Sequence, residues 1–184
     1  MSCIPWEFPQ PFDYIHVRSI TGGIGDWAAL HQQAFLSLNP RGLYEIEGHD
    51  FMLRCDDKSL DKVSSIKQWL SLLHQAAGLA GRPLNVASKH KEWMKHCGFA
   101  CIEEEKFRLP IGTWMDDPKM KAIGQLMRVQ MALAVPSWTM ALFTRHLGWS
   151  AVSVESFIEN VLKEILSVER GLYISWYRTS GRRE

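Results

Sequence analysis

The sequence predicts an α/β fold in which a partial, doubly wound sheet of about four strands carries a helical insertion. The first observation is a strand, a helix and a second strand joined by short connections between Phe12 and Glu47, the arrangement of a parallel crossover unit. The second is a pair of later strand patterns, 99–109 and 172–177, which enclose a helical stretch at 111–170. A sheet flanked by helices accounts for all of these segments.

Each element of the crossover unit has a start and a stop signal. Phe12–Arg18 (FDYIHVR) is rich in strand formers, and a glycine-rich turn at 21–25 leads to Asp26, a good N-cap residue. The helix that follows should end in the turn Asn39–Gly42, and the second strand, Leu43–Glu47, should end at Gly48. The apolar face of the helix consists of Trp27, Leu30, Ala34 and Leu38.

The rest of the sheet follows from the same kinds of pattern. A long helix capped by Ser59 and a shorter one over Val86–Cys97, which Gly98 ends, precede a strand over Phe99–Leu109. The last strand, Leu172–Tyr177, is apolar on both faces, so we expect it between two other strands. The stripe of the long helix consists of Leu60, Val63, Ile66, Trp69, Leu73 and Ala76.

The insertion at 111–170 is predicted to be a helical cap. Its second part is an amphipathic helix that Ser153 caps, with a stripe at Val154, Phe157, Ile158, Val161, Ile165 and Val168. Its first part is rich in methionine and tryptophan, and Trp114, Met127, Met131 and Trp149 are candidates for an adaptable apolar pocket that takes a small-molecule acceptor. The alternative, which is commoner for such stripes, is packing of the cap onto the sheet.

Length and composition favour a single domain over 1–184, divided into a strand-helix-strand part (1–58), helices and a strand (59–110), the cap (111–170) and the last strand and tail (171–184). A formal net charge of +1 disfavours a dedicated nucleic-acid surface, and the arginines near the C-terminus fit a solvated tail. No uninterrupted apolar run is long enough to cross a bilayer, and the N-terminus lacks the order of a signal peptide. We expect a cytoplasmic or nuclear protein that binds neither nucleic acid nor membranes.

The cysteines and histidines do not form a metal-binding pattern. Cys3, Cys55, Cys97 and Cys101 contain no CxxC pair and should be free thiols in a reducing compartment. His90 and His96 lie close to Cys97, but their spacing places them on different faces of one helix, and a fourth ligand is missing nearby. The sequence therefore predicts no metal site.

The amino-acid sequences of these elements resemble those of one protein family. The segments FDYIHVR and GDWAALHQQAFLSLNPRGLYEIEGHD are followed in order by SIKQWLSLLHQAAGLAGRPLNVASKHKEWMKHCGF, FRLPIGTWMDDPKMKAIG and LFTRHLGWS. Together they resemble the second half of the class I S-adenosylmethionine-dependent methyltransferases, in particular the LaeA-like group of fungal secondary metabolism. One departure is Pro40-Arg41-Gly42, where the family usually has Pro-Gly-Gly. Arg41 is tolerable there if its φ is negative, and distorts the turn if it is not.

The resemblance implies S-adenosylmethionine as the cofactor, with an earlier strand and a glycine-rich loop to cradle it. Only Met1–Pro11 stands before the first strand of this chain, so the N-terminal cofactor-binding half of the fold is expected to be absent. The turn at 21–25 lacks the full GxGxxG spacing and is better explained as a strand-to-helix connection. We expect weak or no cofactor binding by this polypeptide.

Doubly wound folds place their ligands at the carboxyl ends of the strands, and this rule selects the candidate site residues. His49 is the best candidate for a general base, with Glu47 or Asp50 orienting it. His16 and Arg18 are candidates for cofactor contacts. The alternatives are that His16 fills the core between strands and that Arg18 pairs with a local carboxylate.

In the strand order that the family implies, the first strand would be an unprotected edge, which recruits partners or aggregates. We therefore expect a protein partner or self-association through residues 13–18. Three functions remain open: a methyltransferase-family protein that another segment or chain completes, a non-catalytic partner or regulator, and a pocket enzyme with cofactor-free chemistry. The first is the main prediction.

Overall fold

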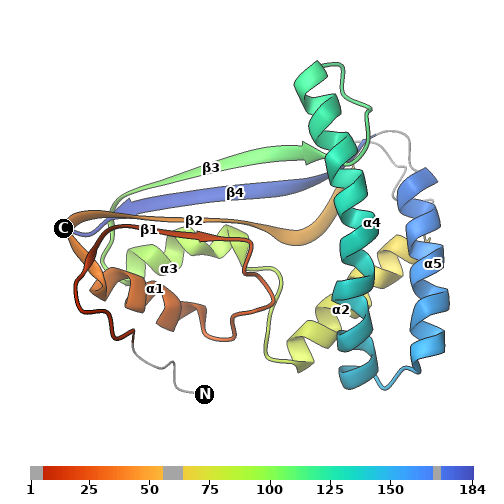
Figure 1. Ribbon diagram of the computed structural model, residues 1–184, viewed down its shortest axis with the longest axis horizontal. Coiled ribbons are helices and arrows are strands. Elements are labelled where there is room, and N and C mark those ends of the chain that lie inside the picture. The colour runs from red at the N-terminus through yellow and green to blue at the C-terminus, as the bar shows by residue number, and fades with distance from the viewer. Residues whose placement is uncertain (1–5, 56–63, 168–170) are drawn as a thin grey trace. The chain divides into compact units, whose positions relative to one another are not determined.

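The computed structural model describes residues 6–55, 64–167 and 171–184. Within these residues the chain contains both long strands and α-helices, together with a short 3₁₀ helix (Figure 1). The elements are β1 (Phe12–Arg18), α1 (Trp27–Leu36), β2 (Leu38–Cys55), α2 (Ser64–Leu79), the 3₁₀ helix η2 (Ala87–Lys89), α3 (His90–His96), β3 (Ala100–Pro110), α4 (Pro118–His146), α5 (Ala151–Ser167) and β4 (Leu172–Arg182). The α/β class that the sequence predicts is confirmed.

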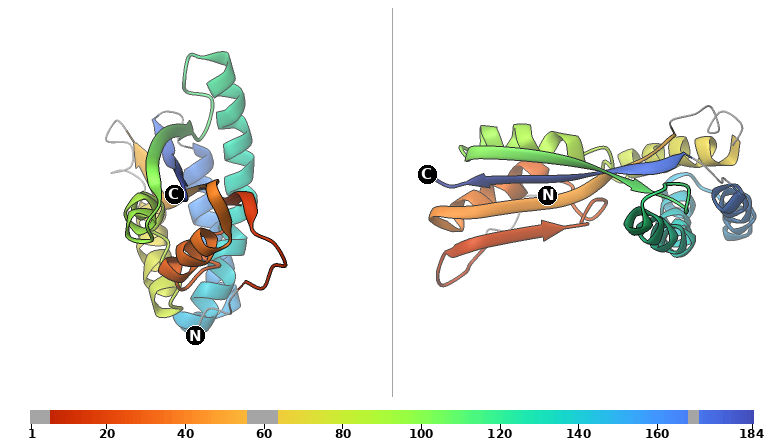
Figure 2. Two further views of the ribbon diagram at one scale, coloured as in Figure 1. Left: turned by 90° about the vertical axis from the view of Figure 1, so that its left-hand side faces the viewer. Right: turned by 90° about the horizontal axis from the view of Figure 1, so that it is seen from above.

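The sheet has four strands in the order β1-β2-β4-β3. Figure 2 shows them side by side in this order, and β1 pairs with β2 in parallel, as the crossover unit predicts. A register shift interrupts that pairing between Phe12 and Tyr14. The last strand lies between β2 and β3, which confirms its predicted interior position.

The chain divides into two compact units. Unit 1 consists of Met1–Asp50, Asn85–Phe107 and Trp176–Glu184, and unit 2 of Phe51–Leu84 and Arg108–Ser175. Each of the long strands β2, β3 and β4 therefore has one segment in unit 1 and one in unit 2.

In unit 1, α1 and α3 cover one face of the sheet (Figure 1). The carboxylate of Asp26 accepts a hydrogen bond from Ala29 N at 2.9 Å, which confirms the predicted N-cap of α1. The helix ends at Leu36, so Leu38 belongs to β2. The buried core consists of Trp27, Leu30, Ala34, Leu38, Tyr44, Ile46, Val86, Met94 and Phe99.

Strand β2 is much longer than the sequence predicts. It begins at Leu38, runs through the expected turn Asn39–Gly42, and passes Gly48 to end at Cys55. Pairing with the end of β4 explains the difference, because Arg41 N donates to Arg183 O and Arg183 N donates to Gly42 O. Arg41 was predicted to be tolerable in place of glycine only if its φ is negative. Its φ is 67°, so this condition is not met.

Unit 2 has a helical core. The predicted stripe of α2 is confirmed where it is described, since Ile66, Trp69, Leu73 and Ala76 are all buried, whereas Ser59, Leu60 and Val63 lie outside the described residues. The indole nitrogen of Trp69 donates to Thr139 Oγ1 of α4 at 2.8 Å. The stripe of α5 is confirmed at Val154, Ile158, Val161 and Ile165, and Val168 lies outside the described residues.

Two helix termini differ in detail from the prediction. The segment after Val86 is the 3₁₀ helix η2 followed by α3, and Gly98 ends it with a φ of 95°, as predicted. Helix α5 begins at Ala151, and the hydroxyl of Ser150 accepts from Ser153 N at 3.1 Å. The capping residue is therefore Ser150, and the prediction of Ser153 is wrong.

Helix α4 has 29 residues, and by length and composition alone it could cross a membrane. The most apolar 18-residue window has a mean hydropathy of 1.2, and 22% of it is buried. Arg128 and Pro136 interrupt its apolar character, which is why no uninterrupted run stands out in the sequence. Leu126 and Leu133 are each 71% exposed on this helix.

Candidate functional site

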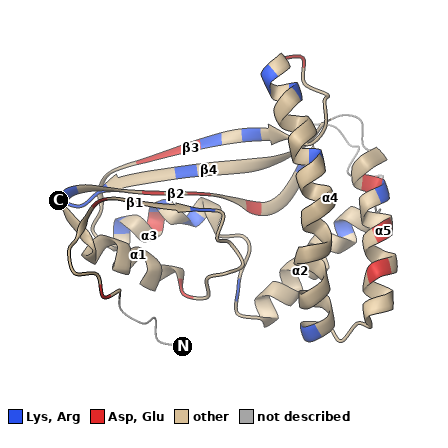
Figure 3. Cartoon of the chain, in the orientation of Figure 1, with Lys and Arg blue, Asp and Glu red and all other residues tan. Residues whose placement is uncertain are grey.

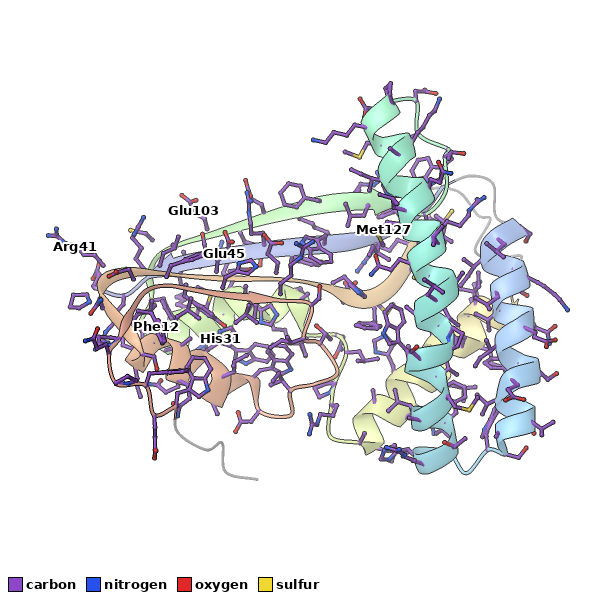
Figure 4. The ribbon with its side chains drawn as sticks, in the orientation of Figure 1. Phe12, His31, Arg41, Glu45, Glu103 and Met127 are labelled. Carbon is purple, nitrogen blue, oxygen red and sulfur yellow. The ribbon has the colours of Figure 1, made fainter. Side chains whose placement is uncertain are left out.

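The side chains of the unit 1 sheet alternate between a helix-covered face and an open face. Ile15 and Val17 of β1 and Tyr44 and Ile46 of β2 pack toward the helices. Their neighbours along the strands point away from the helices. In Figure 4, His31 lies on the side of the helices, whereas Glu45 and Glu103 lie at the other face. The predicted residues His16, Arg18, Glu47 and His49 all belong to this open face by strand alternation.

Three of the predicted site residues meet around Trp176 of β4. The indole nitrogen of Trp176 donates to Glu47 Oε2 at 3.3 Å. The His49 ring lies 6.1 Å from the Trp176 ring between centroids, and the guanidinium carbon of Arg18 lies 5.6 Å from it. We call Arg18, Glu47, His49 and Trp176 the Trp176 cluster. Trp176 was not among the predicted site residues.

The position of the cluster differs from the prediction in one respect. Arg18 does end β1, but Glu47, His49 and Asp50 lie inside β2, which continues to Cys55. They were expected at or just beyond the end of a strand over Leu43–Glu47. The strand instead continues past Gly48 to the buried Phe51 and Leu53, and its alternation shifts by one residue at Phe51, which has a φ of 52°.

His49 is the most perturbed group of the cluster. Burial lowers its pKa to about 4, against an opposing effect of the neighbouring Asp50 carboxylate, which raises it. His49 is therefore neutral at pH 7 and can accept a hydrogen bond or a proton. Glu47 directs its carboxylate to Trp176.

His16 lies further along the open face and has local partners. Its Nδ1 is 3.0 Å from Glu45 Oε1 and 3.1 Å from the Tyr14 hydroxyl, which itself donates to Glu45 Oε1 at 2.9 Å. The imidazole is 36% exposed, so the alternative that His16 fills the core is wrong. Arg18 lies over Trp176, in a cation–π contact.

Charged residues of both signs continue across the open face, as Figure 3 shows along β3 and β4. Arg178 forms an ion pair with Glu105, and this contact raises the pKa of Arg178. The guanidinium of Arg178 also lies 5.6 Å from the Phe107 ring. Contrary to the expectation of a solvated tail, the C-terminal arginines thus lie within or next to β4 and have defined partners.

The four predicted pocket residues all belong to unit 2, where each has packing contacts. Met131 is buried in the core, and Met127 packs against that core. The Trp149 ring lies 5.3 Å from Phe143, and Trp114 Nε1 donates to Leu172 O at 3.0 Å. These contacts are those of the packing alternative, and an acceptor pocket at these residues stays a prediction.

Unit 1 contains a buried histidine pair that the sequence patterns do not indicate. His31 Nε2 of α1 lies 3.2 Å from His90 Nδ1 of α3, and both side chains are buried. Burial lowers the pKa of His31 to about 4, and burial together with His31 lowers that of His90 to about 3. Each histidine lies on an otherwise apolar helix face, so local patterns do not distinguish it from a core residue.

Among the described residues, no group of three or more His, Cys, Asp or Glu side chains could hold a metal ion, and Cys97 and Cys101 are free thiols. The glycine-rich turn at 21–25 connects β1 to α1, where the Asp26 carboxylate already occupies the helix N-terminus. A negative charge at this position disfavours an anionic ligand there.

No protein-family model matches the chain, but curated proteins do. It is 32% identical over 161 residues to methyltransferase pytC of Aspergillus terreus, covering 88% of this chain and 50% of pytC. It is 29% identical to the secondary metabolism regulator LAE1 of Cochliobolus heterostrophus, covering 97% of this chain and 59% of LAE1. For laeA of Aspergillus fumigatus the identity is 27%, over 88% of this chain and 43% of laeA. The chain thus spans about half the length of pytC.

Solved structures similar to the chain include two enzymes. One is phosphoethanolamine N-methyltransferase 2 of Haemonchus contortus in complex with S-adenosyl-L-methionine, with 20% identity and a TM-score of 0.45 over 97% of this chain and 35% of that one. The other is the cyclopropane synthase MmaA2 of Mycobacterium tuberculosis, with 12% identity and a TM-score of 0.44 over 95% of this chain and 56% of that one.

Proposed function

Since the chain is 32% identical to methyltransferase pytC and spans about half of it, we propose that it belongs to the LaeA-like methyltransferase-related proteins and carries the acceptor side of a methyl transfer. The observation that supports this proposal is the Trp176 cluster, in which a buried neutral imidazole, a carboxylate and a guanidinium surround one indole. S-adenosylmethionine, the cofactor that the family implies, would supply an electrophilic methyl group. We propose that this chain alone binds it weakly or not at all.

This chemistry does not require a strong base when the acceptor is a hydroxyl. A hydroxyl that receives a methyl group becomes an oxonium, which is a strong acid, so its proton can pass to a weak base. His49 has a pKa of about 4 and is suited to that late proton transfer rather than to activation of the acceptor beforehand. Trp176 supplies a flat wall for positioning, and Glu47 fixes the orientation of its indole. His16 and Arg18 are proposed to face the cofactor side.

The first experiment is titration of S-adenosylmethionine into the 184-residue chain by calorimetry. We expect no heat of binding from the chain alone. Micromolar binding by the chain alone would contradict the proposed weakness, and would locate a complete cofactor site within these residues. The complement to test is the part of pytC that the match does not cover, co-expressed with this chain. Restored binding supports the proposal, and its absence with a formed complex contradicts it.

The proposed partner surface is the outer edge of β1. This strand lies at one end of the sheet order, and Ser19 N donates to Glu47 O. Because successive residues of a strand alternate their hydrogen-bonding direction, Tyr14, His16 and Arg18 direct their backbone N–H groups outward. A strand from a second chain, or a second copy, can pair there.

A proline at one of these outward positions tests the edge. Tyr14→Pro removes one outward N–H and leaves the β1–β2 ladder unchanged, whereas Tyr14→Ala removes the same side chain and keeps the N–H. We expect the first variant to lose association, measured by size-exclusion chromatography with light scattering, and the second to keep it. If the wild-type chain is a stable monomer and also does not associate with the pytC complement, the proposal that the β1 edge binds a partner is contradicted.

LAE1 and laeA both carry the word regulator in their names, which favours one second candidate, a non-catalytic regulatory partner. A chain of that kind would associate through the β1 edge and show no cofactor binding in the reconstituted complex. The same calorimetric experiment therefore separates the two functions. Both are consistent with the proposed cytoplasmic or nuclear location.

A further inference from the structure

Unit 1 has a concave surface at the end of β1 opposite to Arg18. This surface takes no part in the proposed methyl transfer. The segment Trp6–Pro11, the end of α1, the start of β2 and Arg183 enclose a groove of about 600 Å³. This volume is within the range of small-molecule sites. We call it the Arg183 groove.

Aromatic and aliphatic side chains form the walls of the groove. Trp6 and Phe8 lie edge to face with 5.9 Å between ring centroids, and Phe8 meets Phe12 in the same way at 4.8 Å. Phe8 is 53% exposed and Leu36 is 56% exposed, so the groove presents apolar area to solvent. Such walls accommodate a flat, apolar body.

Gln33 and Arg183 both supply hydrogen-bond donors to the groove, whereas the amide nitrogen of Asn39 in its lining already donates to Asp13 Oδ1 at 2.8 Å. Gln33 Oε1 accepts from Trp6 N at 3.0 Å, which leaves the NH₂ of this carboxamide to donate. Arg183 Nη1 donates to Leu36 O at 3.1 Å and to Leu38 O, and its guanidinium lies 5.3 Å from the Phe35 ring. Nη1 is therefore held in place, while Nε and Nη2 are not used by these contacts.

The groove thus combines an arginine with apolar walls, and its described lining residues include no carboxylate. An arginine fixed at one nitrogen by backbone carbonyls is pre-organised to bind a carboxylate with its remaining donors. We propose that the Arg183 groove binds small aromatic carboxylates, with the ring against Trp6 and Phe8 and the carboxylate at Arg183 and Gln33. The site is independent of the Trp176 cluster, since no residue is shared.

The test uses 2-naphthoate and its neutral counterpart 2-naphthalenemethanol as probes, with calorimetry and ligand-observed NMR on the full chain. We expect 2-naphthoate to bind with a dissociation constant of about 0.1–1 mM, typical of a fragment in an open site, and the alcohol to bind about tenfold more weakly. Equal binding of both probes, or no binding of 2-naphthoate, would overturn the proposal.

Two variants locate the anion, and one serves as their control. Gln33→Glu keeps an oxygen that accepts from Trp6 N, and it replaces the NH₂ donor by a negative charge. Binding of 2-naphthoate should therefore be lost, while binding of 2-naphthalenemethanol should be unchanged. Arg183→Gln should weaken 2-naphthoate about tenfold. Arg182→Gln is its matched control, because Arg182 donates to Arg41 O and does not line the groove.

Arg183 also holds two backbone carbonyls, so Arg183→Gln is interpreted only where its circular dichroism matches that of the wild type. Gln33→Glu keeps the hydrogen bonds of Arg183 to the backbone. It therefore tests where the carboxylate binds even if Arg183→Gln fails to fold. Undiminished binding of 2-naphthoate to folded Gln33→Glu would place the anion elsewhere and overturn the assignment. Trp6→Ala should weaken both probes, since it removes a wall and not the charge.

Discussion

The core of unit 1 encloses polar side chains between its sheet and its helices, whereas the core of unit 2 is built almost entirely from apolar side chains of three helices. His31, His90, Tyr44 and Thr179 are buried in unit 1. In unit 2, the Trp69–Thr139 hydrogen bond joins two helices inside an otherwise apolar cluster. The two units are thus expected to respond differently to substitution and to pH.

The polar groups of unit 1 are incompletely paired. Within the described residues, Trp27 Nε1, His31 Nδ1, the Tyr44 hydroxyl and Thr179 Oγ1 are buried without a hydrogen-bond partner. Each such group costs about 1–3 kcal/mol relative to a satisfied one. In unit 2 the Ser175 hydroxyl is buried in the same way, and this unit has a further constraint, because α4 packs so closely against the backbone of Gly112 that no side chain fits at that point.

The largest effect is expected at that point, Gly124 of α4. A Cβ atom there would lie 1.9 Å from Gly112 O, and Gly112 N donates to Gly124 O at 2.9 Å. Backbone cannot move aside cheaply, so Gly124→Ala should lower the free energy of unfolding by about 3 kcal/mol. Urea denaturation followed by circular dichroism measures it.

Gly78 of α2 is the matched control, because it is also a helical glycine of unit 2 but has no atom within 4 Å of the added Cβ. Gly78→Ala should raise the free energy of unfolding by about 0.5–1 kcal/mol. If the two alanine variants are equally stable, the close approach of α4 to Gly112 does not limit the packing of unit 2.

The next effect is acid sensitivity of unit 1. The folded-state pKa values of His31 and His90, about 4 and about 3, lie below that of an unfolded histidine, so the unfolded state binds more protons as the pH falls below about 6.5. Stability is therefore fully present above that pH and is lost toward pH 4. At pH 5 the expected loss is about 2 kcal/mol for each histidine.

Urea denaturation at several pH values tests this slope. Replacing the pair together, His31→Phe with His90→Leu, should reduce the slope by about two thirds, because His49 of the same unit, whose pKa burial also lowers to about 4, is left to protonate. His96→Gln is the control, since this histidine is exposed at the end of α3 and should leave the slope unchanged. An unchanged slope in the double variant would assign the acid sensitivity to other groups.

The fold was predictable where its signals are local. Asp26 before an apolar helical face, Gly98 after α3 and the apolar strand at Leu172 each determine structure through their own chain neighbours. The extent of β2 was not predictable in this way. Its Asn-Pro-Arg-Gly segment has turn chemistry, and contacts with residues far along the chain, including the hydrogen bonds to Arg183, hold it as a strand.

The candidate site shows the same division. Arg18, Glu47 and His49 could be selected because they follow or lie near predicted strand ends. Trp176 could not, because its contact with Glu47 joins residues 129 positions apart and depends on the insertion of β4 beside β2. The His31–His90 pair likewise joins two helices, and neither helix alone indicates it.

The smallest effect is expected at Arg41, where unit 1 departs from the glycine that its relatives are expected to have. A residue other than glycine in the left-handed region costs about 1–2 kcal/mol, and glycine adds back about 0.4–1 kcal/mol of unfolded-state entropy. Because Arg41 has a φ of 67° and its side chain is exposed, Arg41→Gly should raise the free energy of unfolding by about 0.5 kcal/mol. Arg41→Ala keeps the strain and should be neutral, which makes it the control in the same urea titration. Destabilisation by glycine but not by alanine would mean that the rigidity of Arg41, rather than its strain, determines how β2 pairs with the end of β4.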